Sequence, residues 1–126
     1  MSGYSFDASI LIDALMGHRP AHDEIRRAAN NGARIWMSRM AWIEVMSKGN
    51  EELVRDALRF LGRFSVDEID EEISVRAASL RRERPRLKST DAIIFATAQV
   101  RGRVLVTRNT RDFPPVMPGI RVPYTL

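Results

Sequence analysis

The chain has 126 residues, of which 44% are hydrophobic and 29% charged, a composition typical of one globular domain rather than of a disordered chain. It contains no cysteine, which excludes disulfides, thiolate metal sites and cysteine nucleophiles. The formal net charge is +4 and almost all of the positive charge is arginine, which suits a nucleic-acid partner as well as it suits solvated helix surfaces.

Short apolar stretches and longer amphipathic stretches alternate along the whole chain. In chain order we expect a strand at 3–6, helices at 10–15 and 21–30, a strand at 33–37, helices at 39–48 and 51–61, a strand at 64–66, helices at 68–84 and 89–101, and strands at 103–107 and 120–124. Side chains that can cap these helices are Ser9, Ser38, Asn50, Asp67, and Ser89 or Thr90. The alternation predicts one α/β domain over residues 1–126, with three layers: a central, mostly parallel sheet of four to five strands and helices on both faces. Because Pro123 cannot donate to a sheet, the last strand should lie at an edge.

The chain shows no sign of a membrane segment. No apolar run approaches the roughly 20 residues that cross a bilayer. The N-terminus has no basic flank, and Asp7 and Asp13 interrupt its short apolar stretch, which argues against a signal peptide. Together with the absence of cysteine, these features lead us to expect a cytoplasmic protein.

The stretch 89–98 predicts a helix that is apolar on nearly every side, with Asp91 in its first turn. An acid in a first turn is commonly explained by the helix dipole. However, Ile94, Phe95 and Ala98 follow Asp91 at helical spacing, so its side chain leaves from a face that should be buried. A buried ionised carboxylate costs several kcal/mol unless something compensates its charge.

Three further acids are expected close to Asp91. Asp7 ends the first strand, Asp112 follows the fourth, and Glu44 lies in the helix after the second, so all should meet at the carboxyl ends of parallel strands. Each also has an ordinary explanation: Asp7 could cap a helix, Asp112 could hold a turn, and Glu44 could pair with Lys48. One shared site explains all four positions together.

Carboxylates that share a site need a compensating charge. Two of them about 4 Å apart repel each other by about 4 kcal/mol at an effective dielectric constant of about 20. They must therefore take up protons, pair with arginine or share a cation. Ligands that offer only oxygen favour Mg²⁺ or Mn²⁺ over zinc, and carboxylates around such ions are a common apparatus for phosphodiester hydrolysis.

Four segments together resemble the PIN-domain ribonucleases, and most of all the VapC-type toxins of type II toxin–antitoxin systems: FDASILID at 6–13, SRMAWIEV at 38–45, TDAIIFATA at 90–98 and LVTRNTRDF at 105–113. The resemblance covers essentially the whole chain in the expected order. It implies a PIN-like fold and a metal-dependent endoribonuclease that acts on RNA, forms a homodimer, and is inhibited by a cognate antitoxin whose tail crosses the active-site groove.

The resemblance also implies which residues form the site. Asp7 and Asp91 would bind Mg²⁺ or Mn²⁺ directly, and Glu44 and Asp112 directly or through water. The polar positions that border such a site correspond to Ser9, Thr107 and Asn109. Two positions depart from the family pattern: Ala41 replaces a frequent threonine, and Lys88 replaces a frequent proline.

Two other functions stay open. The chain could be a catalytically silent PIN-like module whose acids are paired or neutral and whose basic surface binds RNA or a protein. It could also be a phosphohydrolase of the haloacid-dehalogenase type, which begins with an acid after the first strand. That chemistry uses Asp-x-Asp, whereas this chain has Asp7-Ala8-Ser9.

Overall fold

The computed structural model describes residues 3–32 and 34–126. The elements in chain order are β1 (Tyr4–Phe6), α1 (Ala8–Leu15), α2 (Arg19–Asn30), β2 (Ile35–Ser38), α3 (Arg39–Met46), α4 (Glu51–Leu61), β3 (Ser65–Asp67), α5 (Glu71–Glu83), α6 (Ser89–Arg101), β4 (Val104–Val106) and β5 (Ile120–Arg121). Ala33, which we expected to begin the second strand, lies outside the described residues. Among the helices of the described ranges, none is both long and apolar enough to cross a membrane.

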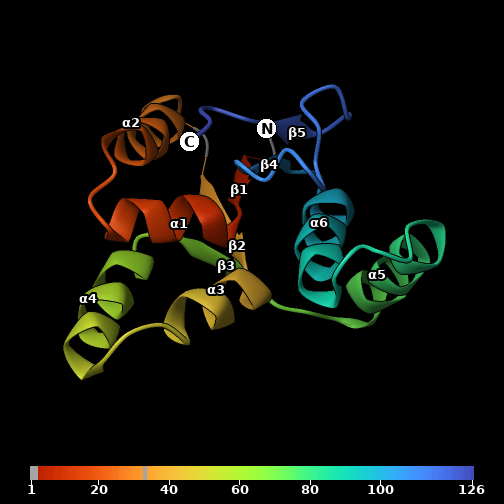
Figure 1. Ribbon diagram of the computed structural model, residues 1–126, viewed down its shortest axis with the longest axis horizontal. Helices are drawn as coiled ribbons and strands as arrows, with labels where there is room; N and C mark the ends of the chain where they lie inside the picture. Colours follow the sequence, from red (N-terminus) through yellow and green to blue (C-terminus); the bar gives the residue numbers. More distant parts are fainter. Residues whose placement is uncertain (1–2, 33) are drawn as a thin grey trace.

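The five strands form one sheet in the order β3-β2-β1-β4-β5, and every neighbouring pair is parallel. Helices lie on both sides of this sheet, with α5 and α6 packed side by side (Figure 1). The predicted three-layer α/β fold is therefore confirmed, and its sheet is wholly parallel among the described strands. Since parallel strands all end at the same edge, the segments that follow β1, β2 and β4 leave from one end of the molecule.

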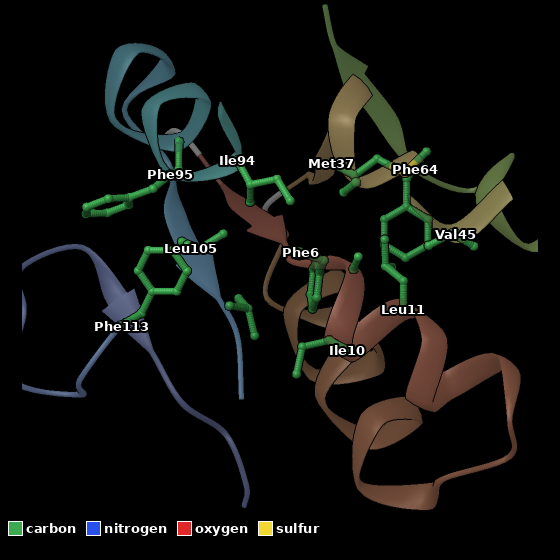
Figure 2. Packing of buried hydrophobic residues seen from close by; sticks show 14 of the residues in the cluster. Phe6, Ile10, Leu11, Met37, Val45, Phe64, Ile94, Phe95, Leu105 and Phe113 are labelled. Atoms are coloured by element: carbon green, nitrogen blue, oxygen red, sulfur yellow. The ribbon is translucent and has the colours of Figure 1, made fainter. Parts of the chain in front are cut away.

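The core lies where side chains from the strands meet those of the helices (Figure 2). Phe6 is fully buried, and its ring makes an edge contact with Phe64 at 5.7 Å between centroids. On the other side of β4, Phe95 of α6 packs against Phe113 at 5.2 Å. Phe6 and Phe113 are the sequence neighbours of Asp7 and Asp112, so the core fixes the backbone at both acids.

Helix α6 is buried along most of its length, as its composition predicts. Its buried side chains are Ala92, Ile94, Phe95, Ala96, Thr97 and Ala98. The Thr97 hydroxyl donates to the carbonyl of Ile93 at 2.7 Å and approaches Ser38 Oγ at 3.3 Å, which ties α6 to the end of β2. The helix ends at Gly102, whose φ of 69° is the left-handed conformation that glycine adopts without strain.

Ser38 and Asn50 cap α3 and α4 as predicted, since their side chains accept from Met40 N and Leu53 N. The predicted caps of α1 and α6 are wrong. Helix α1 begins two residues earlier than expected, at Ala8 with Asp7 at the N-cap, because the chain turns directly after β1; Ser9 lies inside the helix. Lys88, rather than Ser89 or Thr90, occupies the N-cap of α6, and no side chain caps that helix.

The structure also corrects the N-cap of α5 and the length of β5. Asp67 ends β3 and pairs with Arg103, so α5 is capped instead by Asp70, whose Oδ1 accepts from Ile73 N at 2.9 Å. Strand β5 is an edge strand as predicted but stops at Arg121, because Pro123 has no N–H with which to extend the ladder.

Candidate metal centre

A cleft of about 810 Å³ opens at the carboxyl ends of the strands, and all four predicted acids line it. Asp7 comes directly after β1, and Glu44 belongs to α3, the helix that follows β2. Asp91 stands in the first turn of α6, and Asp112 lies in the loop after β4. The parallel sheet thus brings together four carboxylates from separate segments of the chain.

Asp7 is the most enclosed of the four, with an exposed fraction of 4%. Its Oδ2 accepts hydrogen bonds from Ser9 Oγ at 2.9 Å and from Thr107 Oγ1 at 2.8 Å. Burial raises the pKa of Asp7 above its usual range, and these hydroxyl donors only partly oppose the rise. Two of the three predicted supporting residues therefore contact the carboxylate itself.

Asn109, the third supporting residue, links Asp7 to Asp112. Its backbone N–H donates to Thr107 Oγ1 at 3.0 Å, and its side-chain Nδ2 donates to Asp112 Oδ2 at 3.0 Å. The Asp112 N–H donates back to Asn109 Oδ1 at 3.3 Å, and Arg84 Nη2 donates to the Asp112 carbonyl at 2.5 Å. Asp112 does hold a turn, as its ordinary explanation proposes, and it lines the cleft at the same time.

The Asp91 carboxylate has no hydrogen-bond or ion-pair partner among the residues that the structure describes. Burial raises its pKa to about 6, and the negative charges of Asp7 and Asp112 contribute to the rise. The helix dipole alone therefore does not explain the environment of Asp91, because a favourable dipole would lower its pKa.

Glu44 is half-buried and has the same difficulty as Asp91. Burial is the main cause that raises its pKa above the usual range, and the negative charges of Asp7 and Asp91 raise it further. Lys48 acts in the opposite direction but forms no ion pair with Glu44 in the described structure, so the ordinary explanation of Glu44 is not seen. Neighbouring carboxylates thus oppose the ionisation of both Glu44 and Asp91.

The donor set of the cleft suits a hard cation, since it consists of carboxylate oxygens with hydroxyl and amide neighbours. Within residues 3–32 and 34–126, no three acidic or histidine side chains are close enough to hold one ion directly. Mg²⁺ normally keeps several water ligands and binds to one or two carboxylates. The side chains therefore fit a partly hydrated ion, and they do not form a closed protein cage.

Sequence reasoning missed one network beside the cleft. Asp13 is 7% exposed, and its carboxylate accepts from Arg108 Nε at 2.5 Å and Nη2 at 3.1 Å, and from Tyr124 Oη at 2.8 Å. Arg108 lines the cleft, so Asp13 and Tyr124 fix a cation at its wall. The partners lie about a hundred residues apart in sequence, and no local spacing could have indicated the contact.

Residues 4–116 match the PIN domain family. No curated protein matches the chain by sequence. Among solved structures, a toxin–antitoxin complex from Klebsiella pneumoniae is similar, with a TM-score of 0.83 and 35% identity over 98% of this chain and 99% of that chain. DNA-bound VapBC from Salmonella typhimurium is similar with a TM-score of 0.78 and 26% identity over 96% of each chain. FitAcB from Neisseria gonorrhoeae has a TM-score of 0.78 over 98% of this chain and 99% of that chain, but at 16% identity it shows the fold alone.

Proposed function

Because the chain belongs to the PIN domain family, we propose that it is the toxin of a toxin–antitoxin pair and an endoribonuclease that depends on Mg²⁺ or Mn²⁺. The observation that carries this proposal is the convergence of Asp7, Glu44, Asp91 and Asp112 on one cleft. The family match spans all four acids, and the similar complex from Klebsiella pneumoniae supports the assignment as a toxin.

Asp7 and Asp91 would hold the ion directly, while Glu44 and Asp112 would bind it directly or through water. An ion held there would supply positive charge next to a phosphodiester and lower the pKa of a water molecule. The raised pKa values of three of these acids support this role, because burial opposes their negative charges and the neighbouring side chains compensate those charges only in part.

Three polar side chains at the cleft hold two of the acids in place. Ser9 and Thr107 orient the Asp7 carboxylate, and Asn109 orients that of Asp112. Positions fixed before the substrate arrives reduce the reorganisation needed during the reaction. With a pKa of about 6, Asp91 loses its proton as the pH rises through that value, so ion binding should strengthen with increasing pH.

The partners that we propose are an RNA substrate, a second copy of the chain and a cognate antitoxin. Similar solved structures include complexes with antitoxins, which supports the last of these. An antitoxin segment that crosses the cleft would block access to Asp7 and Asp91. Co-purification with a neighbouring gene product that inhibits RNA cleavage would test the antitoxin, and light scattering would test the homodimer.

The nuclease activity is tested by incubating the purified protein with total RNA and Mg²⁺ or Mn²⁺. Cleavage is expected for the wild type, and none with EDTA or in the Asp7→Asn and Asp91→Asn variants. Glu72→Gln, which removes an exposed acid from the first turn of α5, is the control and should cleave as the wild type does. Unchanged cleavage in both aspartate variants would contradict the proposed site.

The same assay separates the two alternatives. RNA binding without cleavage under every metal condition would favour a catalytically silent module. Hydrolysis of a small phosphate ester, without cleavage of RNA, would favour the haloacid-dehalogenase type. The structure gives the second alternative little support, because the position of its second acid is occupied by Ser9, which donates to Asp7.

A further inference from the structure

Four basic side chains line the same cleft as the four acids: Lys48, Arg86, Lys88 and Arg111. All four are exposed. They come from three segments, namely the residues after α3, the connection between α5 and α6, and the loop after β4. The arginine content of the chain is evident from its sequence, but no spacing in the sequence indicates that these four residues meet.

These segments lie on different sides of Asp7. In the sheet, β1 lies between β2 and β4. Lys48 follows α3, which leaves β2 on one side, and Arg111 belongs to the loop that leaves β4 on the other side. Arg86 and Lys88 precede α6, the helix that carries Asp91. The cations therefore form a rim around the acids, and we call these four residues the basic rim.

The basic rim does not neutralise the acids by contact. In the described part of the chain, none of its four side chains forms an ion pair or a hydrogen bond. The two other arginines next to the site are engaged: Arg108 binds Asp13 and Arg84 binds the carbonyl of Asp112. Exposed arginines without such contacts also occur elsewhere, for example Arg34 and Arg63, so it is the position around the cleft that distinguishes the rim.

A nuclease with this site has an electrostatic difficulty. Its acids repel the phosphates on both sides of the bond to be cut, and a bound ion offsets this repulsion only at its own position. Phosphate contacts from lysine and arginine supply most of the sequence-independent affinity of nucleic-acid binding and fix the register of the strand. Lysine and arginine on two sides of Asp7 would supply such contacts for a strand that crosses the cleft.

We infer that Lys48, Arg86, Lys88 and Arg111 bind the backbone phosphates that flank the scissile phosphodiester of a single RNA strand. This inference rests on the proposed ribonuclease function and adds the residues that hold the substrate. It also predicts that the protein acts on extended polynucleotide strands and binds small phosphate esters poorly, since a small ester cannot reach cations on two sides of the cleft.

The test is the salt dependence of RNA binding. A fluorescein-labelled single strand of about 12 nucleotides of mixed sequence is titrated with the protein in EDTA, so that binding is measured without cleavage. In Lys48→Gln/Lys88→Gln, the slope of log K against log salt should fall in magnitude by about 1.4, or about 0.7 for each lost phosphate contact. Arg86→Gln/Arg111→Gln should show the same fall independently.

The matched control is Arg34→Gln/Arg63→Gln, which removes the same charge from exposed positions that precede β2 and β3, at the opposite ends of the strands. Its slope should equal that of the wild type. A fall of the same size in the slope of the control would overturn the inference, even where the wild type cleaves RNA. An unchanged slope in either rim variant would overturn it as well. Absence of cleavage by the wild type in Mg²⁺ and Mn²⁺ would instead overturn the proposed function.

Discussion

Replacing Asp91 by asparagine should stabilise the metal-free protein while it abolishes RNA cleavage. Asparagine has nearly the shape of aspartate and removes the charge that burial and two neighbouring carboxylates oppose. No hydrogen bond or ion pair of the described residues is lost, because the Asp91 carboxylate makes none. A stabilising substitution in the first turn of α6 would show that Asp91 is retained for function rather than for folding.

The size and sign of the effect follow from the pKa of Asp91, which rises from 3.8 to about 6 on folding. Each pKa unit corresponds to about 1.4 kcal/mol, which gives about 3 kcal/mol as an upper value. Because the carboxylate is only partly buried, solvent screening reduces the expected gain to about 1–2 kcal/mol. The folded state binds the proton more tightly, so the wild type loses stability relative to the variant as the pH rises from 3.8 to about 6, and the difference is constant above that range.

Urea unfolding in EDTA at a series of pH values measures this difference. The gain in the free energy of unfolding should be close to zero near pH 3.8 and complete above about pH 6, with a rise in Tm of about 4 °C for each kcal/mol. Glu72→Gln is the control, because Glu72 stands in the first turn of α5 but is exposed; it should lose about 0.3–1 kcal/mol through the helix dipole. An Asp91→Asn variant that is less stable than the wild type above pH 6, or whose gain does not change with pH, would refute the reasoning.

Three further outcomes are expected. Glu24 is 5% exposed, and hydrogen bonds from Arg121 and Arg27 lower its pKa to about 2 against the effect of burial. Glu24→Gln should therefore lower the free energy of unfolding by about 2–3 kcal/mol at neutral pH. Urea unfolding should show this loss disappearing as the pH falls from 4.5 to about 2. Asp67→Ala should lower the free energy of unfolding by about 3 kcal/mol, because it removes a buried carboxylate that accepts two hydrogen bonds from Arg103; a loss under about 1 kcal/mol would contradict this. Saturating Mn²⁺ should raise the Tm of the wild type, and calorimetry should show a much smaller rise in Asp91→Asn.

The order and type of the elements could be predicted because the chain alternates short apolar runs with amphipathic ones. The convergence of Asp7, Glu44, Asp91 and Asp112 followed from one geometric rule, that parallel strands end at the same edge. The lengths of the helices and strands could be predicted less well from the sequence. Strand β5, expected to reach residue 124, stops at Arg121 in the structure.

What the sequence could not show depends on contacts between distant residues. Asp67 and Asp70 are equally good helix caps by type. In the fold, Asp67 ends β3 and pairs with Arg103, 36 residues away, while Asp70 accepts from Ile73 N and caps α5. In the same way, nothing near Asp13 indicates that it holds Arg108 at the wall of the cleft. Such assignments need the fold, because the partner of each side chain is chosen by the topology.

The claim that four distant carboxylates share one cation is tested most directly by crystals of the protein grown with Mn²⁺ and measured for its anomalous signal. We expect a peak in the cleft between Asp7 and Asp91, within reach of Glu44 and Asp112 directly or through water. Manganese peaks elsewhere on the molecule, with none in this cleft, would contradict the claim.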